Sequence, residues 1–487
     1  MKKKFFKKAV CGALAAVSLF ALVSCNFGQD KEIINAYDVA VKNGFQGTVE
    51  EWLRSLRGAN GEDGEDLDLQ AIYEAACQNG YGKDFLSFIK EYFTDTDLSV
   101  QENNDTQTIA KNVTSVVSIC CGFQTTTVVS QGWLGTNEIT KPTAKEGSGV
   151  IVELNKQAGN ALIITNYHVL YHKGSDGERG ISDCIYVYPY GAREGFYKGD
   201  TDVNKDGVVD KKDQGDFNGD GVRATFVGGA MDYDIAILKV EGSSYLQTTE
   251  VSAAKIGNSN ETLIGEKAYV IGNSNGQGIS VTSGAVSVTS EYIAMSALDG
   301  RDLDKNGKTD GVSFRVMRTD AAINHGNSGG ALFNAKGELI GITNAKNVED
   351  ETDNMGYALP ITQVCAVAEN ILANDGVAKR ATLGIITAIT ASSSKLTENG
   401  NLQIIEEVSV AEVQTGVAAS GKLKVGDVIK AVTLNGKTVE LTRRFYLNDA
   451  LLTVRKGNTI SLKILREGQE TTVEITFDKD EYFTTFA

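Results

Sequence analysis

The sequence predicts a mostly β protein with several domains, and three observations support this class. Short apolar segments rich in β-branched residues recur from about residue 109 onward, separated by Gly and Asn. A helical pattern at residues 361–373 closes this series, and a smaller mixture of strand and helix patterns follows it. The length of 487 residues also exceeds what one hydrophobic core serves, because domains usually hold about 100–200 residues.

The first 25 residues are typical of a secretory signal. Five lysines precede an apolar run over residues 9–23, which is shorter than the roughly 20 residues of a membrane-spanning helix. The run ends in Leu22-Val-Ser-Cys25, which resembles the lipobox of bacterial lipoproteins, whose cysteine carries the lipid. We therefore expect a lipid anchor on Cys25 and a chain body on the extracytoplasmic side of the cell membrane. An uncut membrane anchor is the alternative, and it gives the same topology.

Residues 26–106 predict a tether that contains a little helix. Two similar stretches begin at Tyr37 and Tyr73, and each is typical of a short helix ended by Asn-Gly. Gly-X-Y triplets between them resemble a collagen-like tract, but they are too few for a stable triple helix. We interpret this part of the chain as a spacer.

The segment over residues 107–376 predicts a barrel or sandwich of many short strands. The helix at residues 361–373 presents one apolar face, and Asn374-Asp-Gly376 is the natural stop and domain boundary. The expected strands cover residues 113–118, 149–153, 161–165, 185–188, 235–240, 268–271, 284–289, 331–333 and 339–343.

Residues 377–487 predict a second, smaller α+β domain. Strands are expected at residues 384–389, 427–432 and 459–465, with an amphipathic helix near residues 444–454.

Charge and cysteine content limit the partners and the compartment. A formal net charge of −16 makes nucleic acid a poor partner, because phosphates require a basic surface. Of the seven cysteines, Cys11 leaves with the signal and Cys25 would be lipidated, so an odd number remains. A disulfide from Cys184 to either Cys120 or Cys121 is compatible with an oxidising compartment.

Three segments supply the groups that peptide hydrolysis needs: a nucleophile, a base, a group that orients the base, and oxyanion donors. Ser328 lies in a glycine-rich turn, where backbone N–H groups can approach a substrate carbonyl. His168 ends a predicted strand, and Asp234 directly precedes the apolar strand at residues 235–240. The rival bases are His172 and His325, since the chain has only three histidines.

Together these segments resemble the trypsin-like HtrA proteases from about residue 113 to the C-terminus. The order His, Asp, Ser is that of two-barrel serine proteases. The matching segments are Gly-Ser-Gly-Val-Ile at 147–151, Thr-Asn-Tyr-His-Val at 165–169, Asp-Ile-Ala at 234–236, Thr-Asp-Ala-Ala-Ile-Asn at 319–324 and Gly-Asn-Ser-Gly-Gly at 326–330.

The resemblance implies a role for each residue. His168 would be the general base, Asp234 would orient its ring, and Ser328 would attack the substrate. The amides of Gly326 and Ser328, together with Asn327, would form the oxyanion hole. The family often has proline where this chain has His325, so the oxyanion turn departs from the family pattern there.

Substrate and assembly follow from the same resemblance. Ile323 would line the specificity pocket, and a small aliphatic residue is expected before the cleaved bond. The family also implies a homotrimer.

Behind the protease, residues 380–385 resemble the carboxylate-binding loop of PDZ domains. Leu383, Gly384 and Ile385 would hold the C-terminus of a peptide that adds to the domain as a strand. The expected fold is therefore a two-barrel, chymotrypsin-like protease domain followed by an α+β PDZ domain, behind a small helical N-terminal region.

An acidic segment within the protease part has the spacing of a calcium loop. Its oxygen ligands fall at loop positions 1, 3, 5, 7, 9 and 12, with glycine at position 6. A partial copy starts at Asp216 and another at Asp302, and for both an acidic solvated insertion is the alternative. We expect a structural or regulatory Ca²⁺ and no cofactor for catalysis. The proposed ligands are Asp202, Asn204, Asp206, Val208 (by its carbonyl), Asp210 and Asp213.

The sequence thus predicts an extracytoplasmic serine endopeptidase that cleaves unfolded or exposed polypeptides in protein quality control. Its expected parts are a signal over residues 1–25, a tether over 26–106, a protease domain over 107–376 and a PDZ domain over 377–487. Two other classes remain as alternatives. One is a catalytically silent PDZ scaffold or chaperone, and the other is a calcium-dependent surface adhesion protein.

Overall fold

The computed structural model describes the second of the two compact units into which the chain divides, residues 1–104 and 105–487. The described residues are Cys77, which is helical and exposed, and 105–130, 136–173, 179–195, 197–198, 216–217, 219–302, 305, 308–344, 355–397 and 401–486. The predicted signal with Cys25, nearly all of the tether and the first acidic loop at 202–213 lie outside them. No helix in the described part is both long and apolar enough to cross a membrane.

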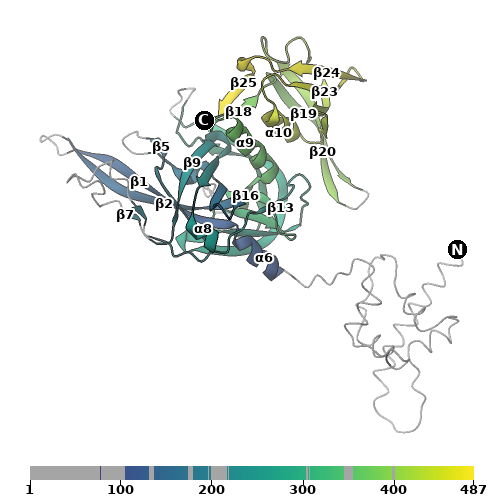
Figure 1. Ribbon diagram of the computed structural model, residues 1–487. Helices are drawn as coiled ribbons and strands as arrows, with labels where there is room; N and C mark the ends of the chain where they lie inside the picture. Colours follow the sequence, from purple (N-terminus) through teal and green to yellow (C-terminus); the bar gives the residue numbers. More distant parts are fainter. Residues whose placement is uncertain are drawn as a thin grey trace, which may run out of the picture. The chain divides into compact units, whose positions relative to one another are not determined.

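The first half of this unit is a closed, six-stranded antiparallel barrel (Figure 1). Its strands are joined in the order β1-β2-β3-β10-β9-β6, and β-branched side chains such as Val117, Ile151 and Ile163 fill the inside. Two short hairpins, β4–β5 and β7–β8, accompany it. The bounds are β1 Val116–Ser130, β2 Thr136–Asn155, β3 Asn160–Thr165, β4 Tyr171–Lys173, β5 Arg179–Ile181, β6 Cys184–Pro189, β7 Tyr197–Lys198, β8 Asp216–Phe217, β9 Val222–Ala230 and β10 Ile235–Val240.

A second barrel follows. The sheet runs β16-β15-β12-β13-β14-β17, and the pairing of β17 back to β16 closes it, while β11 adds to β16 in parallel. The prediction of two barrels is therefore confirmed. The bounds are β11 Lys255–Ile256, β12 Lys267–Asn273, β13 Ile279–Ser296, β14 Gly311–Thr319, β15 Ala331–Asn334, β16 Glu338–Asn344 and β17 Gly356–Pro360.

Helices connect and close the barrels. Helix α9 buries Val364, Val367 and Ile371 in a core shared with strands of both barrels. It ends where Asp375 and Gly376 take positive φ angles of 53° and 89°, which a continuing right-handed helix does not allow. The bounds are α6 Asp105–Val113, α7 Tyr167–Leu170, η2 Met231–Tyr233, α8 Ser244–Thr248, η3 Ser274–Gly276 and α9 Ile361–Ala373.

The C-terminal part is an α+β domain with its own core. Its main sheet runs β19-β20-β21-β23-β24, with β22 beside β21, and β18 pairs with the final strand β25. The side chains of Leu447, Leu462 and Phe477 lie in its buried cluster. The bounds are β18 Ala378–Ala381, β19 Ile385–Leu396, β20 Leu402–Val413, β21 Val428–Leu434, β22 Lys437–Glu440, α10 Phe445–Thr453, β23 Thr459–Arg466, β24 Gln469–Thr476, η4 Asp480–Tyr482 and β25 Phe483–Phe486.

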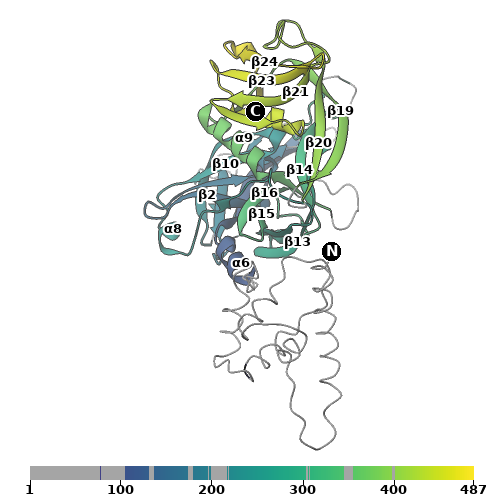
Figure 2. The same cartoon turned by 90° about the vertical axis from the view of Figure 1, so that its right-hand side faces the viewer.

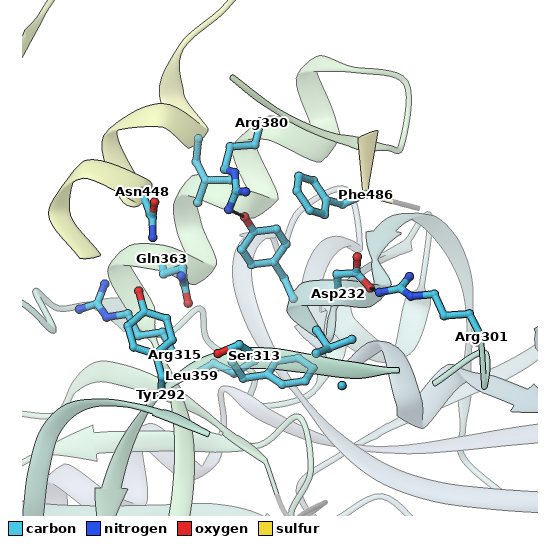
Figure 3. A pocket seen from close by; sticks show the side chains of 15 residues that line it. Asp232, Tyr292, Arg301, Ser313, Arg315, Leu359, Gln363, Arg380, Asn448 and Phe486 are labelled. Atoms are coloured by element: carbon cyan, nitrogen blue, oxygen red, sulfur yellow. Dashed lines mark hydrogen bonds and ion pairs between the residues drawn. The ribbon is translucent and has the colours of Figure 1, made fainter. Parts of the chain in front are cut away.

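The second barrel and the C-terminal domain are joined by buried polar contacts as well as by α9, which Figure 2 shows between them. Arg315 of β14 pairs with Asp449 of α10 at 2.5 Å, and its guanidinium lies 3.5 Å from the centre of the Phe445 ring. Beside this pair is a cavity of about 270 Å³, which Figure 3 shows from close by. Arg380 reaches into the cavity and donates to the Tyr233 hydroxyl at 2.9 Å.

Candidate active site

His168 and Asp234 meet where the strands of the first barrel end. His168 lies in the short helix α7, directly after β3, and Asp234 directly precedes β10, which pairs with β3. The His168 Nδ1 lies 2.6 Å from the Asp234 Oδ2, and the His168 backbone N–H donates to the Asp234 Oδ1 at 2.9 Å. The carboxylate therefore fixes both the position and the ring orientation of the histidine.

Asp234 is held by further donors in a fully buried site. Its side chain has 0% exposure, and its φ of 52° is unusual for a residue other than glycine. Asn344 at the end of β16 donates to Oδ2, and Asn166 donates to the Asp234 carbonyl, both at 2.9 Å. A buried carboxylate needs such donors, because desolvation alone would disfavour its charge. The surrounding hydrogen bonds therefore hold the Asp234 backbone in its left-handed conformation.

Ser328 is brought to the same place by contacts between the two barrels. The Ser148 N–H donates to the Ser328 carbonyl at 2.8 Å, and the Thr165 hydroxyl donates to the Ser148 carbonyl at 2.7 Å. A Cβ added to Gly329 would lie 2.3 Å from the Thr165 hydroxyl and 3.1 Å from the Asn166 nitrogen. The serine turn therefore packs against the residues that immediately precede His168, and only glycine fits there.

The turn before Ser328 is shaped by a second loop. Gly326 has a φ of 87°, and a Cβ on it would lie 2.0 Å from the Asn273 carbonyl oxygen. The Asn275 N–H donates to the His325 carbonyl at 2.7 Å. In a trans peptide the C=O and the N–H point in opposite directions, so the Gly326 N–H is directed away from Asn275. This orientation frees the N–H for a substrate oxyanion.

One residue of the predicted oxyanion hole is corrected. The Asn327 N–H donates to the Asn324 carbonyl at 3.1 Å, so it closes the turn and is not directed at a substrate. The Asn327 carbonyl accepts the Thr343 hydroxyl, which further fixes the turn. Gly326 and Ser328 remain the candidate donors.

The rival histidines lie elsewhere. His172 is in β4 with its ring 5.1 Å from the Phe123 ring, and the His325 side chain is exposed. Ile323 packs against a buried cluster of the second barrel, and a Cβ on Gly356 would lie 2.8 Å from its Cδ1. Ile323 thus lies beside β17, next to the segment that leads to Ser328.

Sequence reasoning did not identify several residues that shape this site. Asn344, Asn275 and the hydroxyl of Ser148 act across the fold, through contacts between residues distant in sequence. Ser148 lies within a matched motif, which is the one signal that pointed to it.

The predicted peptide-binding loop forms a tight turn before β19. The Leu383 carbonyl accepts the Ala419 N–H and the Gly384 carbonyl accepts the Gln414 N–H, while Gly384 has a φ of 68°. Arg380 does not contact this loop through its guanidinium, which lies over the Phe486 ring instead. The edge of β19 is unpaired within the described sheet, as an added strand requires.

In the first partial acidic repeat, Asp220 accepts from Arg193. Just before the second one, Arg301 pairs with Asp232 at 2.5 Å and approaches Asp299. In the described part of the chain, no group of three or more His, Cys, Asp and Glu residues could hold a metal ion. The complete loop at 202–213 lies outside that part.

The three cysteines of the first barrel are buried free thiols. Cys120, Cys121 and Cys184 form no disulfide with one another. Burial raises the pKa of the Cys120 thiol to about 12, with Glu146 and Glu194 adding to the shift. Burial also raises the pKa of the Cys121 thiol, so Cys120 and Cys121 are neutral core side chains.

Known proteins resemble the chain in both parts. Residues 147–342 match the trypsin-like peptidase domain family, and residues 382–477 match the PDZ domain family. The chain is 30% identical over 348 residues to the serine protease Do-like HtrA of Bacillus subtilis, across 69% of this chain and 65% of the relative. The corresponding protein of Lactococcus lactis subsp. cremoris is also 30% identical, across 69% and 71%. The periplasmic pH-dependent serine endoprotease DegQ of Escherichia coli is 32% identical, across 52% and 51%.

The matched region thus spans just under two thirds of the Bacillus relative.

Proposed function

Since the chain belongs to the HtrA family of serine proteases, we propose that it is an extracytoplasmic endopeptidase that cleaves unfolded or exposed polypeptides. His168 takes the proton of Ser328, Asp234 orients the imidazole, and the Gly326 and Ser328 amides stabilise the oxyanion. The observation that carries this proposal is the hydrogen bond of 2.6 Å between His168 and the buried Asp234, at the turn that bears Ser328.

Digestion of an unfolded protein tests this proposal. Wild type should degrade reduced casein, whereas Ser328→Ala should lose about 10⁴-fold or more in kcat/KM and keep its thermal transition. Full activity of Ser328→Ala would remove Ser328 from the mechanism. If wild type binds the casein but never cleaves it, the protein is a silent scaffold or chaperone.

The PDZ domain recognises the C-termini or extended segments of these polypeptides. The turn at Leu383, Gly384 and Ile385 next to the free edge of β19 supports this role. A small aliphatic residue before the cleaved bond suits Ile323, and quality control is the expected biological role.

The chain acts at the outer face of a membrane, through a lipid on Cys25, and assembles as a homotrimer. The lipobox-like sequence supports the anchor. Two acyl chains are needed for firm retention, because one gives only marginal binding. Cys25→Ala should therefore move the protein from the membrane fraction to the soluble fraction. A Cys25→Ala protein that stays firmly bound at unchanged mass would indicate an uncut anchor.

The acidic loop at residues 202–213 binds Ca²⁺ and stabilises the protease part. Sites of this extracellular type have Kd values of about 0.1–1 mM, so millimolar Ca²⁺ adds only about 0.5–1.5 kcal/mol. EDTA should lower the Tm, and Ca²⁺ should restore it better than Mg²⁺. An unchanged Tm with and without Ca²⁺ would make the loop an ordinary solvated insertion. Attachment of cells to a matrix without proteolysis would support the adhesion alternative.

A further inference from the structure

A cavity of about 310 Å³ opens beside the first barrel, close to the oxyanion turn. It lies where β1 and β6 approach the start of β13. Among the residues that line it are Ser118, Pro189, Tyr190, Ala192, Glu194 and Ile279.

One carboxylate lines this cavity, and a second lies on the neighbouring strand β2. Glu194 lines it, and Glu146 lies opposite Cys120 in the pairing of β1 with β2, on the same face as Ser118. Both carboxylates add to the rise in the pKa of the Cys120 thiol. The pKa of Glu146 is itself raised, mainly by burial and secondly by the negative charge of Glu194. The two acidic side chains are therefore close enough to repel each other.

Neither carboxylate has an ion-pair partner among the residues that the structure describes. The neighbouring cations are engaged elsewhere, because Lys145 donates to the Tyr171 carbonyl and Arg193 pairs with Asp220. The raised pKa of the Cys120 thiol keeps it neutral, so it adds no charge of its own beside the carboxylates.

A third polar group in the cavity also lacks a partner. The Ser118 side chain is 1% exposed, and its hydroxyl has no hydrogen-bond partner within the described structure. A buried hydroxyl without a partner costs free energy, so it marks a place where a ligand or water completes the bonding. This observation is independent of the acidic pair.

The cavity neighbours two segments that hold the serine turn: Ser118, which lines it, pairs with Ser148 of β2, and Gly278 follows the loop that contains Asn275. Ile323, which is expected to contact the residue before the cleaved bond, packs beside β17. Ser148, by contrast, belongs to β2 of the first barrel and donates to the Ser328 carbonyl, and Glu146 precedes Ser148 by only two residues. A Cβ on Gly276 would lie 1.8 Å from the Glu146 Oε2, so this carboxylate also touches the loop that holds the oxyanion turn.

We propose that Glu146, Glu194 and Ser118 form a subsite for a lysine or arginine side chain of the substrate, on the C-terminal side of the cleaved bond. The proposal rests on the peptidase function proposed above. The ammonium or guanidinium relieves the repulsion between the two carboxylates, and a long aliphatic stem suits Ile279 and Pro189. The protease would then select for basic residues after the cleaved bond, although its specificity pocket is apolar.

Matched peptides test the subsite. A quenched peptide that the full chain cleaves is varied to Lys, Gln or Glu at each of the first three positions after the cleaved bond. At one of them we expect kcat/KM to be about fivefold higher for Lys than for Gln, and lowest for Glu, because a partly exposed pair contributes modestly. The preference should weaken as salt rises.

Substitutions of the two carboxylates test whether they cause the preference for Lys over Gln. Glu146→Gln combined with Glu194→Gln should remove the difference between Lys and Gln, whereas Glu153→Gln, an exposed position on the same strand, should retain it. Labelling of Ser328 by a fluorophosphonate checks that each variant keeps a reactive site. Equal rates for Lys and Gln at all three positions, or a preference that survives the double variant, would overturn the proposal.

A binding measurement distinguishes failure of the subsite from failure of the proposed peptidase function. Fluorescence anisotropy with Ser328→Ala should show tighter binding of the Lys peptide than of the Gln peptide, and the added double substitution should equalise them. Equal affinities in Ser328→Ala would also count against the subsite. A Lys preference in binding without any cleavage by wild type would support the subsite and overturn the peptidase assignment.

Discussion

At the scale of single residues, the site depends on how a buried carboxylate is satisfied. Asp234 is fully buried and accepts from both His168 and Asn344. The hydrogen bond to His168 can orient the imidazole during proton transfer only if the Asp234 carboxylate itself stays in place. Asn344 therefore acts as a positioning residue, through Asp234.

Replacing Asn344 by Ala should lower kcat about tenfold and change KM much less. The Asp234 carboxylate would lose one donor in a buried site, and the resulting misorientation affects the transition state more than substrate binding. Michaelis kinetics with active-site titration measure both constants.

Asn334→Ala is the control, because Asn334 is also buried but its side chain accepts from the backbone N–H groups of Lys336 and Glu338 at the turn between β15 and β16. It should lower stability and leave kcat unchanged. An equal loss of kcat in both variants would mean that Asn344 is merely structural.

At the scale of elements, two loops define the oxyanion turn. The residues around η3 contact the turn through the Asn275 N–H and the Asn273 carbonyl, and the strand β2 contacts it through Ser148. Ser148 donates its hydroxyl to the Gly326 carbonyl and accepts the Asn273 N–H, so it links both loops. The turn is thus specified by its neighbours as well as by its glycines.

Gly326→Ala should lower kcat by about 10²-fold or more, because the added Cβ displaces the turn from the Asn273 carbonyl and moves an oxyanion donor. Gly265→Ala is a close control. Gly265 has a φ of 85°, against 87° for Gly326, but a Cβ there meets nothing within 4 Å.

Both variants should lose about 1 kcal/mol of stability from the backbone strain, and only Gly326→Ala should also lose activity. Urea unfolding and peptide hydrolysis measure the two effects. A Gly326→Ala enzyme with wild-type kcat would exclude this turn as the oxyanion site.

The element scale also shows where the strand predictions were incomplete. The helix at residues 361–373 and the strand at 235–240 agree with the structure to the residue, and the strand predicted at 161–165 begins one residue earlier, at Asn160. Strands β9, β14, β20 and β24 were not predicted, because polar residues interrupt their apolar runs, and in β14 the interrupting residue is the buried Arg315. These segments form strands because they pair with neighbouring strands of the sheet.

At the scale of the whole molecule, Arg315 joins the second barrel to the PDZ domain. Its side chain is 1% exposed, and it donates to Ser290 and Asn260 as well as to Asp449. Burial raises the pKa of Asp449, and the nearby Arg315 opposes that shift. The arginine therefore favours the charged form of a buried carboxylate at the domain junction.

Arg315→Ala should destabilise the full chain by about 3 kcal/mol at neutral pH, because it leaves the Asp449 carboxylate buried without its cation. The loss should grow with pH. Without Arg315 the pKa of Asp449 rises further above its unfolded value, so stability is retained at low pH and lost as pH rises through the folded pKa.

Thermal melts at about pH 5 and about pH 8 measure this dependence. Arg318→Ala, which removes a half-exposed partner of Glu291, should cost less than about 1 kcal/mol at either pH. A loss for Arg315→Ala that does not vary with pH would show that Asp449 is not the group left unpaired.

The sequence by itself determined the mostly β class, the helix that ends the protease part, and His168, Asp234 and Ser328 as a candidate triad. These features depend on local periodicity and on residue types in a fixed order, which a single sequence displays. Only the tertiary structure selected His168 over His172, moved Asn327 out of the oxyanion hole, and brought Asn344, Asn275 and Ser148 to the site. It also paired Arg315 with Asp449 and placed Glu194 and Ser118 at one cavity, next to the strand that carries Glu146. Apart from the local turn from Asn324 to Asn327, these results join residues distant in the chain, and such contacts follow from strand pairing and barrel closure, which local patterns do not encode.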